Sequence, residues 1–151
     1  MDGLYVVLMN LSRMLAADGE GATKLMECAV TGAVDTKNAK IIAKSVITST
    51  LFKCAIFGED ANWGRVLCAM GYSGADFDPD KVDVSFVSDA GEIQVCAKGR
   101  GLDFDETKAK KILTEHDVTI AVTMGEGNGQ CTCWGCDLTY DYVKINGDYR
   151  T

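Results

Sequence analysis

One carboxylate in this sequence stands where it could meet a ligand, because Glu20 lies between Gly19 and Gly21 in the stretch ADGEGATK. Glycines adopt backbone conformations that other residues avoid, and they leave the carboxylate between them unobstructed. A carboxylate presented in this way can form a charge-assisted hydrogen bond with the ammonium group of a ligand. The same glycines can also end a helix, so the residues alone leave a helix-terminating loop and a ligand contact both open.

The C-terminal stretch YVKINGDYRT combines packing residues with hydrogen-bonding groups. Terminal residues are usually poorly ordered unless another part of the protein holds them. The apolar side chains of Tyr142, Val143 and Ile145 therefore predict that the last element packs against the body of the protein. Asn146 offers donors and acceptors, and Thr151 offers a hydroxyl, so the same stretch could form part of a site.

The stretch CTCWGC, from Cys131 to Cys136, is the most suggestive of a metal site. Structural zinc takes four sulfur or imidazole ligands in a tetrahedron. Along a strand Cys131 and Cys133 share one face, whereas Cys136 lies on the other. A second CxxC pair is absent and His116 is the only histidine. We therefore expect packing cysteines, a solvated histidine, and neither a metal nor another cofactor.

Two further stretches have both a chemical and a structural interpretation. GEGNG, at residues 125–129, could cradle a phosphate through its backbone N–H groups. It lacks the Lys-Ser/Thr pair and the following helix of phosphate-binding loops, so it predicts a hairpin turn. DFDPDKVD, at residues 76–83, has acidic spacing similar to that of calcium loops. It lacks the central glycine and the distal glutamate of an EF-hand, so we expect a solvated turn.

The composition excludes several classes of function. The chain has 151 residues, and 15 basic against 22 acidic residues give a net charge of −7. A surface this acidic repels phosphate backbones and anionic lipids, so nucleic acid and membrane are poor candidate partners. The N-terminal sequence lacks the basic start and the small-residue cleavage site of a signal peptide. We therefore expect a cytoplasmic protein whose seven cysteines are reduced.

The elements that must position these residues follow from the hydrophobic periodicity. A period of three to four residues predicts helices at residues 3–17, 62–70 and 103–115, and another that begins at Asp35 or Thr36 and ends at about 49. Asp137 or Thr139 can begin a last helix or a turn at residues 140–146. Alternation or short apolar runs predict strands at residues 24–32, 81–87, 92–98, 116–124 and 130–138, and a strand or extended link at 52–58.

Turn residues and the only proline cluster in GYSGADFDPD, which marks a candidate boundary. Helices and strands alternate before this stretch, and strands dominate after it. The patterns predict an α+β fold with a helix plus α/β lobe at residues 1–76 and a strand-rich lobe with a short helix at residues 77–151.

Three blocks closely resemble the bifunctional ornithine acetyltransferase/glutamate N-acetyltransferase family of arginine biosynthesis: DGEGATKL, AIFGEDANWGRVLCAMGYSGADFD and WGCDLTYDYVKINGDYRT. The resemblance implies a precursor that cuts itself into two chains and frees a threonine nucleophile on the downstream chain. It also implies that this threonine takes acetyl from N2-acetylornithine, or from acetyl-CoA, and passes it to L-glutamate. The tetrahedral intermediate would be stabilised by an oxyanion hole on the upstream chain.

Position by position, the resemblance assigns substrate binding to three residues. Glu20 matches the glutamate of the family's Glu-Gly-(Ala/Val)-Thr-Lys motif, Asn146 matches the asparagine near the C-terminus, and Thr151 matches the hydroxyl residue that ends the family's downstream chain. The nucleophile is expected upstream of the first helix, so no residue of this sequence is assigned a catalytic role. The resemblance therefore implies most of the downstream (beta) chain, inactive by itself.

The partners implied in this way are the upstream (alpha) chain, in a heterotetramer, and the substrates N2-acetylornithine and glutamate. We expect apolar residues of the first helix to face the upstream chain and to be exposed without it: Leu4, Val7, Leu8 and Leu11. A non-catalytic α+β binding or interaction module that keeps the wall of the pocket is the alternative. A zinc-ribbon-like module would require bound metal.

Overall fold

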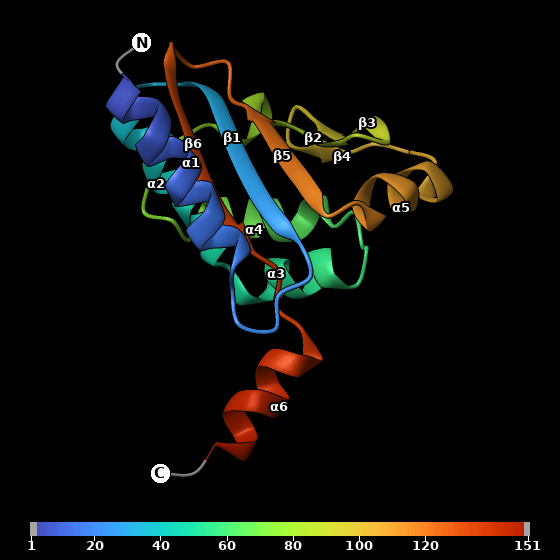
Figure 1. Ribbon diagram of the computed structural model, residues 1–151. Helices are drawn as coiled ribbons and strands as arrows, with labels where there is room; N and C mark the ends of the chain where they lie inside the picture. The colour runs from blue at the N-terminus through green and yellow to red at the C-terminus, as the bar shows by residue number, and fades with distance from the viewer. Residues whose placement is uncertain (1–2, 150–151) are drawn as a thin grey trace.

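The computed structural model describes residues 3–149, and its centre is one mixed sheet of six strands in the order β4-β3-β2-β5-β1-β6 (Figure 1). The strands are β1 (Leu25–Ala33), β2 (Asp83–Ser88), β3 (Gly91–Ala97), β4 (Arg100–Gly101), β5 (Asp117–Thr123) and β6 (Gly129–Cys136). β1 runs parallel to β5 and antiparallel to β6, and the other neighbours pair antiparallel. The α+β class that the sequence predicts is confirmed.

One face of the sheet carries the hydrophobic core. Alternate residues of β1 point into it, and Met26, Cys28 and Val30 are at most 1% exposed, as the period of two in a half-buried strand requires. Four helices cover this face: α2 (Thr36–Thr48), α3 (Thr50–Phe57), α4 (Trp63–Gly71) and α5 (Glu106–Thr114). Phe52 of α3 stacks on Phe86 of β2 with ring centroids 6.4 Å apart, which joins helices and sheet.

Polar side chains begin these helices as capping chemistry predicts. The Asp35 carboxylate accepts a hydrogen bond from the backbone N–H of Asn38 and begins α2, and the side chain of Asn62 accepts from the N–H of Arg65 and begins α4. The predicted helices at these positions are confirmed to within a residue or two.

Residues 52–58 were expected to form a strand or an extended link, and that prediction is wrong because they belong to α3. Ser49 ends α2, and its side chain accepts a hydrogen bond from the N–H of Phe52, so a new helix begins at once. Phe52, Ala55 and Ile56 then share the buried face of α3. A short apolar run does not distinguish a buried strand from a buried helix by its periodicity.

The opposite face of the sheet carries α1 (Gly3–Ala17), which lies across β6 and β1 (Figure 1). None of the residues of α1 is buried. The guanidinium of Arg13 forms an ion pair of 3.1 Å with the carboxylate of Asp117, where β5 begins. The first helix is therefore present as predicted, with its apolar side chains largely open to solvent.

The last helix, α6 (Tyr140–Asp148), projects away from the sheet (Figure 1). Its apolar residues were expected to pack against the body, and that prediction is wrong for this chain. Tyr142, Val143 and Ile145 are 43%, 62% and 44% exposed, and no residue within α6 is buried. The helix is joined to the body through its first turn and through Asn146.

The boundary predicted between residues 76 and 77 falls between α4 and the 3₁₀ helix η1 (Pro79–Lys81). β1 comes before this position and β5 and β6 come after it, yet β1 lies between them in one sheet. The division into two lobes stays a prediction, and the sheet crosses it. Among residues 3–149, no helix is long and apolar enough to cross a membrane.

Candidate functional site

The structure brings Glu20 and Asn146 into direct contact, although 126 positions separate them. The Asn146 side-chain amide donates a hydrogen bond of 2.6 Å to Oε2 of Glu20, and the same nitrogen donates to the carbonyl of Tyr142 at 2.9 Å. Glu20 belongs to the glycine-flanked turn between α1 and β1, whereas Asn146 lies on the second turn of α6. The convergence expected from the resemblance is therefore present for two of the three residues.

The pair is open to solvent and has unused hydrogen-bonding capacity. Both side chains are exposed. Among the described residues, no hydrogen bond reaches Oε1 of Glu20 or Oδ1 of Asn146. This pair of residues therefore keeps two acceptor oxygens, one from a carboxylate and one from an amide. This arrangement suits a ligand that presents an ammonium group.

The local backbone explains why the turn lies against α6. Gly21 has φ of +66°, a left-handed conformation that favours glycine. A Cβ atom at this position would approach the backbone nitrogen of Tyr142 to 2.9 Å. The hydroxyl of Thr139 donates a hydrogen bond of 2.6 Å to the Gly21 carbonyl and accepts one of 3.2 Å from the N–H of Tyr142. One threonine therefore begins α6 and fastens the turn to it.

Thr151, the third residue that the resemblance assigns to the site, lies outside the described residues, as do Met1, Asp2 and Arg150. Its role in substrate binding stays a prediction.

Sequence reasoning missed the buried polar residues beneath the turn. Asp137 is 3% exposed and its carboxylate accepts hydrogen bonds from Thr23 and Lys24. Lys24 is 7% exposed, and its ammonium group donates to the carbonyl of Leu113 at 2.5 Å and lies 3.9 Å from the Glu59 carboxylate. Both residues belong to the blocks that carry the family resemblance, and Asp137 was otherwise expected only as a candidate start of the last helix or turn.

Two of the three cysteines of β6, Cys131 and Cys133, pack against the core. Cys28 is fully buried on β1, and Cys131 and Cys133 lie partly buried beside it on the same face of the sheet. Burial raises the pKa of the Cys28 thiol far above its ordinary value, and burial with the neighbouring Cys131 raises the pKa of Cys133 to about 11. Among residues 3–149, no group of three or more His, Cys, Asp or Glu side chains is placed to hold a metal ion.

The loop GEGNG turns the chain from β5 towards β6, but the hairpin that it was expected to close does not form. β1 lies between the two strands, so the loop crosses the end of β1. The N–H groups of Glu126 and Gly127 both donate to the carbonyl of Gly32, at 2.7 Å and 2.9 Å. These amides are already paired within the protein and do not form a phosphate cradle.

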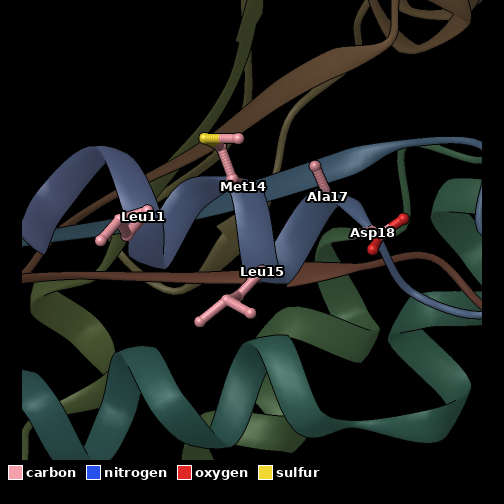
Figure 2. A pocket seen from close by; sticks show the side chains of 5 residues that line it. All are labelled: Leu11, Met14, Leu15, Ala17 and Asp18. Carbon is pink, nitrogen blue, oxygen red and sulfur yellow. The ribbon is translucent and has the colours of Figure 1, made fainter.

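The outer face of α1 forms an apolar surface. Leu4, Val7, Leu8 and Leu11 are 63%, 53%, 53% and 49% exposed, which confirms the exposure expected for this helix. Leu11 also lines an open hollow beside the helix, together with Met14, Leu15, Ala17 and Asp18 (Figure 2). Exposed apolar patches of this kind usually mark a site for another protein surface.

The fold is α+β, and the contact between the Glu20 turn and α6 places an exposed carboxylate and an exposed amide together at one end of the sheet. Comparison with known proteins gives the family. The profile of the ArgJ family matches residues 1–151, and the chain belongs to that family.

Its relatives include the arginine biosynthesis bifunctional protein ArgJ 1 of Clostridium acetobutylicum, which is 57% identical over 98% of this chain and 36% of the relative. A glutamate N-acetyltransferase of Methanosarcina mazei is 43% identical over 99% of this chain and 38% of that protein. The crystal structure of the bifunctional protein ArgJ from Bacillus halodurans superposes with a TM-score of 0.90 and 44% identity, over 97% of this chain and 67% of the solved chain. The chain thus spans little more than a third of the length of these curated relatives.

Proposed function

We propose that this chain provides part of the substrate-binding site of an acetyltransferase in arginine biosynthesis, which moves acetyl from N2-acetylornithine or acetyl-CoA to L-glutamate. The observation that carries the proposal is the contact between Glu20 and Asn146, 2.6 Å long, in a chain that belongs to the ArgJ family. Two relatives carry names that fit this activity, a bifunctional arginine biosynthesis protein and a glutamate N-acetyltransferase.

The chemistry of the substrates fits the exposed pair. N2-acetylornithine carries an ammonium group on its side chain, and glutamate carries one on its α-carbon. Oε1 of Glu20 and Oδ1 of Asn146 are both acceptors, so each can accept a hydrogen bond from an N–H of such a group. Glu20 adds a charge-assisted bond, which is about twice as strong as a neutral one. Thr151 completes the proposed set with its hydroxyl.

Two further parts complete the proposed enzyme. An upstream chain would supply the oxyanion hole, and the threonine nucleophile would lie on the downstream chain, ahead of α1. The exposed apolar surface of α1 supports a partner of this kind. Burial of Leu8 and Leu11 against it would stabilise the complex by about 25 cal/mol for each Å² of apolar surface removed from water. A heterotetramer in the cytoplasm is the assembly and location that we propose.

A hybrid enzyme tests the proposal. The part of the Clostridium acetobutylicum relative that matches this chain, 36% of its length, is replaced by the 151-residue chain. We expect the hybrid to transfer acetyl from N2-acetylornithine to glutamate, and the 151-residue chain alone to form no acetyl adduct by intact mass. A folded, assembled hybrid that binds substrate without transferring acetyl supports the non-catalytic binding module instead.

A further inference from the structure

The segment that leads from β6 into α6 makes several hydrogen bonds with the Glu20 turn. Asp137, the first residue after β6, is 3% exposed. Its Oδ1 atom accepts hydrogen bonds from the backbone N–H groups of Thr23, at 2.8 Å, and of Lys24, at 3.1 Å. Its Oδ2 atom accepts one of 2.5 Å from the hydroxyl of Thr23. The N–H of Asp137 donates in return to the Lys24 carbonyl at 3.2 Å.

Every donor to this carboxylate belongs to the segment that follows Glu20. An unpaired buried carboxylate is strongly unfavourable, so the three hydrogen bonds from Thr23 and Lys24 hold the segment in one conformation. Asp105 offers a useful contrast, because its carboxylate accepts from Thr107 and Lys108 in its own helix, α5. The donors to Asp137 are instead distant in the sequence, since Lys24 lies 113 positions and Thr23 lies 114 positions before it.

A second connection lies two residues further along the chain. Thr139 joins the Gly21 carbonyl to the first turn of α6 through its hydroxyl. Asp137 therefore fixes the side of the turn that leads into β1, and Thr139 fixes its tip. Glu20 lies next to Gly21, so its position relative to Asn146 depends on both contacts.

We propose that Asp137 is a positioning residue for substrate binding, which holds the turn so that the Glu20 carboxylate faces Asn146. The inference rests on the proposed function, in which Glu20 and Asn146 bind the ammonium group of an amino-acid substrate. Asp137 is buried beneath the turn and acts through Glu20. Its removal therefore changes substrate affinity in the same direction as removal of the Glu20 charge.

Kinetics of the hybrid enzyme test the proposal in a double-mutant cycle. Asp137→Ala is expected to raise KM for the amino-acid substrate by about tenfold or more, with a smaller change in kcat. Asp137→Asn keeps an acceptor for both N–H groups and is expected to restore KM to within about threefold of the original value. In a Glu20→Gln background, Asp137→Ala should change KM by less than about twofold, because the residue through which it acts has lost its charge. An equal effect of Asp137→Ala in both backgrounds overturns the proposal.

A spectroscopic measurement on the 151-residue chain separates this inference from the proposed function. The side-chain amide signal of Asn146 reports its hydrogen bond to Glu20, and Glu20→Gln identifies the signal of the weakened bond. Asp137→Ala is expected to shift the Asn146 signal in the same direction, and Thr23→Val, which removes one of three bonds, is expected to shift it less. Asp105→Ala, the matched control, should lower the melting temperature without moving this signal.

An Asn146 signal that moves in Glu20→Gln but not in Asp137→Ala or Thr23→Val shows that Asp137 does not position the turn. If Asp137→Ala fails to fold, Asp137→Asn and Thr23→Val decide the same question. If Glu20→Gln leaves KM unchanged, the proposed function fails, and the amide signal still decides whether Asp137 positions Glu20.

Discussion

Cys28 of β1 lies directly opposite Cys133 of β6, in the register where these antiparallel strands pair. Cys133 is partly exposed, and burial with the nearby Cys131 raises its pKa to about 11. Thiolate is the reactive form, so its fraction at pH 8 is roughly a hundredfold lower than for a thiol of pKa 9.0. Alkylation at pH 8, followed by peptide mass spectrometry, should modify the exposed Cys54 and Cys68 long before Cys28 or Cys133.

The same pKa has a consequence for stability. Because folding raises the pKa of Cys133, its stabilising contribution is complete below pH 9 and is lost as the pH rises through about 11. The free energy of unfolding should therefore fall less between pH 8 and pH 11 in Cys133→Ala than in the original chain. Alkylation of Cys133 as fast as Cys54 would contradict both expectations.

Substitution of Glu20 or Asn146 should weaken substrate binding with little effect on folding, because both side chains are exposed. Asn146→Ala removes one or two hydrogen bonds, each worth about 0.5–1.5 kcal/mol, or up to about 3 kcal/mol to a charged group. We expect kcat/KM of the hybrid enzyme to fall roughly threefold to over a hundredfold. Glu20→Gln should cost at least as much, because it removes the charge that faces the ligand.

Two exposed residues away from the site serve as controls for these substitutions. Glu92→Gln on β3 and Asn128→Ala in the loop before β6 repeat the chemical changes elsewhere on the surface. Steady-state kinetics should leave both controls within about twofold of the original enzyme. Equal losses in controls and site variants would show that the site is elsewhere.

Gly21→Ala should loosen the contact between the turn and α6. A non-glycine residue in the left-handed region costs about 1–2 kcal/mol, and the Cβ would also lie 2.9 Å from the nitrogen of Tyr142. Gly74→Ala is the matched control, since Gly74 has φ of +80° and no atom within 4 Å of an added Cβ. Hydrogen exchange should speed up across α6 in Gly21→Ala alone, whereas the free energy of unfolding should fall by about 1–2 kcal/mol in both variants. Unchanged protection of α6 in Gly21→Ala would be evidence against the contact.

The apolar surface of α1 should be required for assembly with the upstream chain. Leu8→Glu places a charge on this surface, where Leu8 is 53% exposed, and should weaken association by more than about tenfold. Leu51→Glu on α3 repeats the change at a residue that is 62% exposed, and should leave association unchanged. Co-purification and analytical ultracentrifugation measure the difference, and full assembly of Leu8→Glu would exclude this surface as the interface.

Much of the secondary structure could be predicted because periodicity and capping residues act locally. Asp35 and Asn62 begin α2 and α4, and alternation identifies β1, β2 and β5. The apolar run at residues 52–58 was misread, because only Ser49, the residue that ends one helix and begins the next, marks it as helical. The two-residue strand β4 carries no pattern of its own.

The site depended on a different kind of information. Nothing local to Glu20 or Asn146 specifies that they meet, since the contact is made by the return of α6 to a turn that is 126 positions away. The family resemblance supplied that pairing. It did not show how the turn is held, because Asp137 and Thr139 bind it mainly through its backbone N–H and carbonyl groups, which any residue type can supply.

The position of β1 in the sheet also affects the order in which the chain can fold during synthesis. Leu25 pairs with Asp117 on β5 and with Cys136 on β6, so both neighbours of this strand are made long after it. At about 5–20 residues per second, a ribosome leaves β1 without either partner for roughly 5 to 20 seconds. Such non-local pairing slows folding. The helices α2 to α4, which are made directly after β1, are therefore the elements available to cover its apolar face until β5 and β6 emerge.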